Sequence, residues 1–331
     1  MPAPPQPNSA EYQTIRRLVI AALDPVIHGM SDRVKPAMTG KEGRKAMDFG
    51  AQIFFTESSI APAELGVALE QRGFDSLWVA EHSHIPEKRR FTLPGNMQLT
   101  REYYDVMDPF VTLTAAAVAT RSLKLATAIC LVIQRDTIQT AKSVASLDQI
   151  SGGRLLFGIG IGWNAEEMED HGTVYATRAQ KMREQIEAMK LIWTKDVAEY
   201  HGDIVGFPPM IARPKPVQRP HPPVIIGGAF RHAARRAIRY GDGLLPQGPA
   251  QGSGSPAEYM PQLRRMAAEA GRDPASLPVT FGNAPADADL LKHYRDLGIA
   301  RVTVRLPAAG RDEVLPILDR YAALMREVRA G

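Results

Sequence analysis

The sequence predicts an α/β protein built as a parallel (β/α)8 barrel, a TIM barrel, preceded by an N-terminal extension. Short apolar runs alternate with amphipathic helical stretches eight times from Met47 onward. A helix separates each of these strands from the next, as parallel pairing requires. Residues 47–331 also match the roughly 250 residues typical of such a barrel. An open, doubly wound sheet is the alternative with the same alternation.

Each element is assigned from its periodicity and end signals. Proline near a start and glycine after an end mark several of the helices, as at Pro62 and Gly73. The predicted strands cover 49–55, 76–80, 123–130, 154–160, 224–226, 243–245, 277–281 and 301–306. The predicted helices cover 62–72, 109–120, 137–150, a long stretch through Met182 and Trp193, 230–240, 256–270, 286–297 and 312–328. A hairpin tip at 200–203 and an extended connection at 207–223 interrupt the alternation.

Composition indicates a soluble globular protein. The chain is 44% hydrophobic and 23% charged, and no apolar run reaches the roughly 18 residues that a membrane helix needs. No small-residue cleavage pattern of a signal peptide follows the apolar run at 18–30. The single Cys130 excludes an internal disulfide. We therefore expect a cytoplasmic protein without a membrane partner.

Residues 1–46 read as an appendage, and the folded domain is predicted to span 47–331. The first eight residues are proline-rich, and a helix is expected around 12–23. The segment holds seven Lys/Arg against four Asp/Glu, so it carries +3 of the formal +4. It has neither interleaved aromatics nor a groove-reading motif, so nucleic acid is not an expected partner.

Three glycines end the fourth predicted strand, at Gly158, Gly160 and Gly162. Without Cβ atoms there, either a neighbouring strand or a flat ligand can approach closely. A dinucleotide fingerprint would need glycine where Trp163 stands, and no Gly-Lys-Ser/Thr of a P-loop follows. Asn164 is a predicted cap of the next helix, with two glutamates suited to its dipole in the first turn.

Four motifs in order along the chain give it a family resemblance. They are Gly73-Phe-Asp-Ser-Leu-Trp-Val-Ala-Glu-His82, then Ser146-Leu-Asp-x-x-Ser-x-Gly-Arg-x-x-x-Gly-x-Gly-x-Gly-Trp163, then Lys215-Pro-Val-Gln-Arg-Pro-His-Pro-Pro-Val-Ile-Ile-Gly-Gly228, and 237–243. Over 47 to about 243 the sequence resembles the bacterial luciferase-like flavin or deazaflavin oxidoreductases. It is most similar to the branch that uses coenzyme F420, because the domain is compact and lacks larger insertions.

The resemblance implies a flavin-type ring at the mouth of the barrel. It implies a non-prolyl cis peptide between Ala128 and Ile129, which buttresses the ring. It implies that the loop Gly227-Gly228-Ala229, after the predicted strand 224–226, holds the phosphate of the cofactor, with Arg231 as a charge partner. Helix N-termini do suit phosphates. The implied cofactor-binding residues are Ala128, Ile129, Gly160, Gly162, Trp163, Asn164, Gly227, Gly228 and Ala229.

His82 and Glu81 are the candidate catalytic residues, at the end of the second predicted strand. The family often places a histidine after an acid here, and imidazole can give or take a proton near neutral pH. Glu81 has the opposite strand parity, so it is expected to orient backbone or an arginine. The alternative for His82 is an ordinary hydrogen-bonding role.

His82 and His84 also raise the possibility of a zinc-dependent hydrolase. The other strand ends offer no further ligands, so no metal is predicted. A cofactor carrier without turnover is a third possibility.

The predicted function is transfer of a hydride between F420 and a small organic substrate. The alternative is a monooxygenase that uses reduced FMN and oxygen. Loops 83–107 and 246–256 are expected to line the entrance, where Tyr103, Tyr104, Arg89 and Arg90 offer stacking or anion contacts unless the arginines are simply solvated. Arg178 and Lys181 are expected on a solvated or subunit-facing surface. The family resemblance implies a homodimer.

Overall fold

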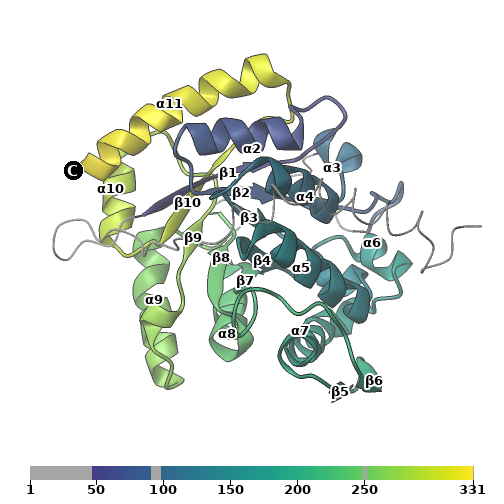
Figure 1. The fold of residues 1–331 in the computed structure, drawn as a ribbon. Helices are drawn as coiled ribbons and strands as arrows, with labels where there is room; N and C mark the ends of the chain where they lie inside the picture. The colour runs from purple at the N-terminus through teal and green to yellow at the C-terminus, as the bar shows by residue number, and fades with distance from the viewer. Residues whose placement is uncertain (1–46, 91–97, 249–251, 331) are drawn as a thin grey trace, which may run out of the picture. The chain divides into compact units, whose positions relative to one another are not determined.

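Eight parallel strands follow one another around a barrel in the computed structural model, which describes residues 47–90, 98–248 and 252–330 (Figure 1). The hydrogen-bonded order is β8-β7-β4-β3-β2-β1-β10-β9. A parallel bridge between Leu244 and Val279 joins β8 to the chain just before β9, so the two edges of the sheet meet. The predicted TIM barrel is confirmed, and the open sheet is excluded.

A helix follows every barrel strand and covers the outside of the barrel (Figure 1). The barrel strands are β1 (Asp48–Ile53), β2 (Ser76–Val79), β3 (Lys124–Thr127), β4 (Leu155–Ile159), β7 (Val224–Gly228), β8 (Gly243–Pro246), β9 (Thr280–Phe281) and β10 (Arg301–Arg305). The helices that follow them are α2 (Pro62–Gln71), α4 (Pro109–Ala119), α5 (Thr137–Ser151), α7 (Arg178–Thr194), α8 (Phe230–Tyr240), α9 (Pro256–Glu269), α10 (Ala288–Asp296) and α11 (Arg311–Ala330). Two short helices, α3 (Glu102–Asp105) and α6 (Ala165–Asp170), lie in the loops after β2 and β4.

The predicted hairpin tip at 200–203 is confirmed, but the extended connection that was predicted to start at 207 is wrong at its beginning. Strands β5 (Ala198–His201) and β6 (Gly206–Met210) pair antiparallel outside the barrel. The two prolines of β6 suggested a connection without secondary structure, yet a two-stranded ribbon leaves one edge of β6 without hydrogen bonds and tolerates them. The helix expected around 12–23 lies outside the described residues.

Two apolar layers hold the barrel together, one inside it and one between strands and helices. The inner layer contains Trp78, Ala126, Leu156 and Ile225, all buried, with Ala128 and Leu245 packed against it. Successive strand residues point to opposite faces, so the neighbours of these residues pack against the helices instead. The inner layer therefore closes the barrel from below and leaves its carboxyl-terminal mouth open. Within the described ranges, no helix has the length and apolarity needed to cross a membrane.

Candidate active site

A cavity of about 660 Å³ opens at the carboxyl ends of the barrel strands. Its size and place are those of a small-molecule site in a barrel enzyme. It is lined by every predicted site residue except Asn164, namely Glu81, His82, Ala128, Ile129, Gly160, Gly162, Trp163, Gly227, Gly228 and Ala229. Asn164 is only 1% exposed and lies behind the wall, where its amide Nδ2 donates to Glu167 Oε2 over 3.4 Å. It occupies the N-cap position of α6, but its side chain makes no capping hydrogen bond.

The floor of the cavity is the Ala128–Ile129 segment that follows β3. The peptide bond between these residues is cis, as the family resemblance implied. A Cβ atom on Gly160 or Gly227 would overlap the side chain of Ile129, and one on Gly158 would overlap the carbonyl oxygen of Thr127. These glycines therefore serve first to let the strands and Ile129 pack, and Ile129 presents the apolar surface on which a flat ligand can rest.

His82 stands in the wall of the cavity with one nitrogen held. Its Nδ1 lies 2.8 Å from Oε2 of Glu167, and the side chains are 8% and 0% exposed. Oε1 of Glu167 accepts the backbone N–H of Ser83 at 3.0 Å. A carboxylate only accepts hydrogen bonds, so Nδ1 carries the proton in this contact. The other nitrogen, Nε2, has no partner among the described residues and is left for a ligand in the cavity.

Glu167 is the site residue that sequence reasoning missed. It was assigned to the first turn of a helix, where an acid suits the dipole, and it does lie in α6. The contact with His82 spans 85 positions in the chain. No local pattern encodes such a contact. The only available signal was that the ends of β2 and β4 open on the same mouth.

Aromatic side chains surround His82, and we call this part of the cavity the histidine end, defined by His82, Tyr103 and Trp163. The ring centroid of His82 lies 5.3 Å from that of Tyr103 and 5.8 Å from that of Trp163. Phe54 packs against Tyr103 at 5.0 Å, and Arg305 lies over Phe54 at 4.8 Å. These rings enclose His82 Nε2, which has no partner in the described ranges, in apolar surroundings.

The other entrance residues lie away from the cavity. Tyr103 lines it, whereas Tyr104 is 50% exposed and is not part of the lining. Arg90 pairs with Glu166 at 2.6 Å and with Glu169 at 2.5 Å on the surface of α6. Arg89 donates to the backbone carbonyl of Pro86 at 3.0 Å. The described part of loop 83–107 thus contributes Tyr103 to the site, while the arginines serve the surface.

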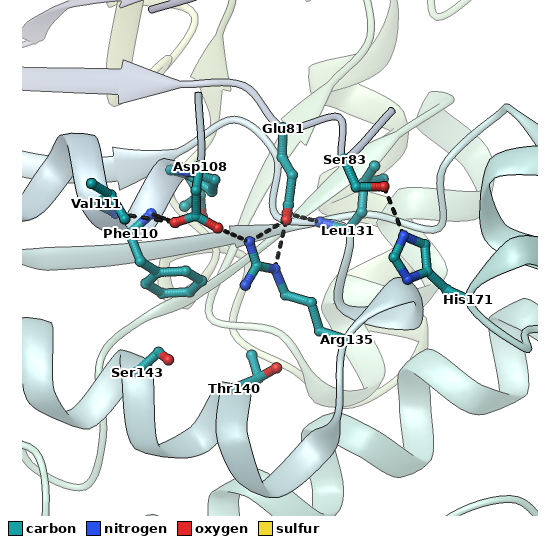
Figure 2. A network of polar contacts seen from close by, with 12 residues as sticks. Glu81, Ser83, Asp108, Phe110, Val111, Leu131, Arg135, Thr140, Ser143 and His171 are labelled. Atoms are coloured by element: carbon teal, nitrogen blue, oxygen red, sulfur yellow. Dashed lines mark hydrogen bonds and ion pairs between the residues drawn. The ribbon is translucent and has the colours of Figure 1, made fainter. Parts of the chain in front are cut away.

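Glu81 ties three segments together beneath the histidine end. Figure 2 shows Arg135 between Glu81 and Asp108, with Nε of Arg135 2.5 Å from Glu81 Oε1 and Nη2 2.5 Å from Asp108 Oδ2. The second oxygen of Glu81 accepts the N–H of Leu131 at 2.6 Å. Burial acts to lower the pKa of Arg135, but Glu81, Cys130 and Asp108 together outweigh it, and the pKa is raised. Burial also raises the pKa of the Cys130 thiol, and Glu81 raises it further, so this thiol stays protonated.

Backbone amides and cations form the opposite part of the cavity, which we call the arginine end: Gly228, Ala229, His232, Arg236 and Arg178. Gly228 has φ 130°, a conformation that other residues rarely adopt, and it turns β7 into α8. Within the described chain, the N–H groups of Ala229 and Arg231 have no acceptor, while that of Phe230 donates to Ser253 Oγ at 3.1 Å. Free amides and positive charge at a helix start suit an anion.

Two expectations about arginines change here. Arg178 was expected on a solvated or subunit-facing surface, but it lines the arginine end, with its guanidinium 3.7 Å over the ring of Tyr175. The sequence shows the polar side of α7 but not that its first turn reaches the mouth of the barrel. Arg231 does not line the main cavity and borders a separate hollow with Ser253 and Glu258.

His82 and His84 do not converge on a common point. His82 is held by Glu167, whereas His84 Nε2 lies 3.0 Å from Asp170 and its Nδ1 lies 2.9 Å from Ser83 Oγ. Among the residues that the structure describes, no group of three or more His, Cys, Asp or Glu side chains is arranged to hold a metal ion.

The site fits a planar ligand with an anionic tail. An apolar floor at Ile129 and aromatic walls lie at one end, and at the other lie amides that have no acceptor and arginines that have no carboxylate partner among the described residues. The fold and site together define a parallel-barrel protein with a small-molecule-sized cavity at the mouth of its barrel.

The chain belongs to the luciferase-like monooxygenase family, whose sequence model matches residues 57–290. It is an enzyme of the luciferase-like oxidoreductase and monooxygenase class. The family assignment suggested by the sequence motifs is thereby confirmed.

Individual relatives differ in the cofactor that their names state. The chain is 36% identical over 285 residues to an uncharacterized protein of Mycobacterium tuberculosis, covering 84% of this chain and 98% of that one. It is 37% identical over 111 residues, 33% of this chain and 31% of the other, to an FMNH2-dependent dimethylsulfone monooxygenase of Pseudomonas putida. The solved structure of an F420-dependent secondary alcohol dehydrogenase with an F420-acetone adduct superposes with a TM-score of 0.67 at 17% identity, covering 86% and 99% of the two chains.

Proposed function

We propose that the protein is an F420-dependent oxidoreductase that transfers a hydride between the deazaflavin ring and a small organic substrate. The observation that carries the proposal is the orientation of His82. Glu167 holds its Nδ1, and no residue that the structure describes forms a hydrogen bond with Nε2, which lies in the cavity wall. Bound F420 supplies hydride donor and acceptor chemistry at carbon C5 of its ring.

His82 is proposed to give or take, at Nε2, the proton that accompanies hydride movement. Glu167 accepts from Nδ1, so it fixes the tautomer and stabilises the ring when it is doubly protonated. Tyr103 and Trp163 pack around the imidazole and exclude water from it. Glu81 is proposed as a positioning residue, because both of its oxygens are engaged with Arg135 and Leu131.

Two parts of the cavity wall are proposed to hold the cofactor. Ala128 and Ile129 support the ring, with Gly160, Gly162 and Trp163 beside it. The backbone of Gly227, Gly228 and Ala229 holds the phosphate. Asn164 is proposed to act indirectly, through its contact with Glu167.

The second candidate is a monooxygenase that uses reduced FMN and oxygen. The observation that favours it is the segment 37% identical to the FMNH2-dependent enzyme of Pseudomonas putida. Both cofactors are planar rings with a phosphate-bearing tail, so both fit the same cavity. The identity of the ring decides the chemistry, because deazaflavin reacts poorly with oxygen.

Equilibrium titration of the full chain with F420 and with FMN tests the ranking. We expect saturable binding of F420, followed as a change in its fluorescence, at concentrations where FMN binds weakly. Tight binding of FMN with none of F420 would reverse the ranking. A cytoplasmic homodimer is proposed by analogy with the family alone, and sedimentation equilibrium of the full chain tests the dimer.

A further inference from the structure

Positive charge continues from the arginine end of the cavity onto the surface between α7 and α8. Arg236 lines the main cavity and also a second hollow of about 530 Å³, which Arg183, Arg235 and Arg239 border. Figure 1 shows α7 and α8 side by side on the outside of the barrel. One side chain therefore joins the two hollows. We call this set the basic track, made of Arg178, Arg183, Arg235, Arg236 and Arg239.

Most of the basic track lacks partner carboxylates. Arg178, Arg235, Arg236 and Arg239 form no ion pair with any residue that the structure describes. Arg183 is the exception, with Glu184 at 3.3 Å and Glu187 at 3.9 Å. Some arginines elsewhere are paired, as in Arg329–Asp75 and Arg311–Glu64, whereas others, such as Arg265, form no ion pair with a described residue. What distinguishes this face is that four such arginines gather around two adjoining hollows, one of which is the main cavity.

Holding these cations together costs free energy in the absence of an anion. Burial lowers the pKa of Arg236, the neighbouring Tyr240 opposes that change, and Arg178 lowers the pKa further. Nε of Arg178 and the hydroxyl of Tyr240 are buried without a hydrogen-bond partner in the described part of the chain. Unpaired like charges and unsatisfied polar atoms are stabilised when an anion lies between them.

We propose that the basic track binds an anionic chain that continues beyond the phosphate of the cofactor, as the γ-glutamyl tail of F420 does. The inference rests on the proposed function. FMN ends at its phosphate and reaches no further than the arginine end. The phosphodiester of F420 leads on to a chain of carboxylates, and arginine recognises phosphate and carboxylate groups alike. The track therefore also discriminates between the two cofactors.

Fluorescence titration with three deazaflavins tests the proposal: the alcohol that lacks the phosphate, F420 with a short glutamyl tail and F420 with a long one. For the unaltered chain at low ionic strength, we expect affinity to rise along this series. The double variant Arg235→Glu/Arg239→Glu should lose about tenfold in affinity for long-tailed F420 and bind the alcohol as before. Added KCl should weaken the binding of long-tailed F420 more than the binding of the alcohol, because salt screens exposed charges.

The matched control is Arg265→Glu/Arg326→Glu, which makes the same charge change at exposed positions of α9 and α11. It should bind all three deazaflavins as the unaltered chain does, and thermal unfolding checks that both double variants fold. The inference would be overturned if tailed and tail-less deazaflavins bound with equal affinity and if neither Arg235→Glu/Arg239→Glu nor KCl changed that affinity. The proposed function would still stand. Failure of the unaltered chain to bind any deazaflavin would overturn both.

Discussion

The two ends of the cavity differ in how their charges are satisfied. At the histidine end, His82 is held by Glu167, and the Glu81 carboxylate beneath it is shared by Arg135 and the Leu131 amide. At the arginine end, Arg178 and Arg236 have no carboxylate partner among the described residues. The contrast indicates that the histidine end is organised without a ligand, and it underlies our proposal that an anion binds at the arginine end. Proton transfer needs the first arrangement, and binding of an anion needs the second.

The largest expected effect is a loss of turnover when the imidazole of His82 is removed. His82→Ala removes the proposed proton donor and acceptor, and turnover should fall by roughly 100-fold or more. Affinity for F420 should hardly change, since the phosphate contacts lie at the other end. Steady-state change of the F420 absorbance with a turnover substrate measures the first quantity, and fluorescence titration measures the second. His82→Gln keeps a hydrogen-bond donor for Glu167 but cannot carry the proton. Comparing it with His82→Ala therefore separates loss of the proton carrier from loss of the partner of a buried carboxylate. Unaltered turnover in both variants refutes the role.

The next effect is on stability and tests whether the histidine end is preorganised. Glu81→Gln leaves the guanidinium of Arg135 without its buried partner, so the free energy of unfolding should fall by about 3 kcal/mol. Urea unfolding followed by circular dichroism measures the change. Glu57→Gln is the control, because the Glu57 side chain is 75% exposed in its pair with Arg101 and such pairs contribute little. Equal stability of both variants would show that the network is dispensable.

A smaller effect should follow from Glu167→Gln. The amide cannot accept from both His82 Nδ1 and the Ser83 N–H, so the imidazole loses its fixed tautomer. Turnover should fall about tenfold with little change in F420 affinity. Nitrogen NMR of labelled histidine should find the proton on Nδ1 of His82 in the unaltered chain and a mixture in the variant. If the tautomer of His82 were unchanged in the variant, Glu167 would not be the residue that fixes it.

The smallest effect concerns residues 1–46. A chain that begins at Met47 should fold and bind F420 as the full chain does, because every described contact of the cavity lies in the barrel. Circular dichroism and the same titration measure both properties. Precipitation of the shortened chain would count against a domain boundary at Met47. A weaker affinity confined to long-tailed F420 would instead assign the extension to the arginine end.

The barrel was predictable because its signals are local. Strand and helix periods, with Pro62 and Gly73 as end signals, are encoded within each segment. The placement of His82 and Gly228 at the mouth followed from strand order, since parallel strands end on the same side. The cis bond before Ile129 came only from the family resemblance.

The missed features depend on contacts between distant segments. Glu167 reaches His82 from a loop two strands away, and no periodicity encodes that contact. Arg178 was misplaced because helix periodicity gives a polar face but not what that face adjoins. The glycine at position 160 indicated that a neighbouring group comes close to the backbone there. The sequence did not show that this group is the side chain of Ile129.

The central claim is that the cavity binds F420 with its ring at the histidine end and its phosphate at the arginine end. A crystal structure of the protein soaked with F420 tests it most directly. We predict electron density for the ring on the Ala128–Ile129 segment beside His82 and for the phosphate at the backbone amides of Gly227, Gly228 and Ala229. An empty cavity at saturating F420, or a phosphate bound away from those amides, would contradict the account.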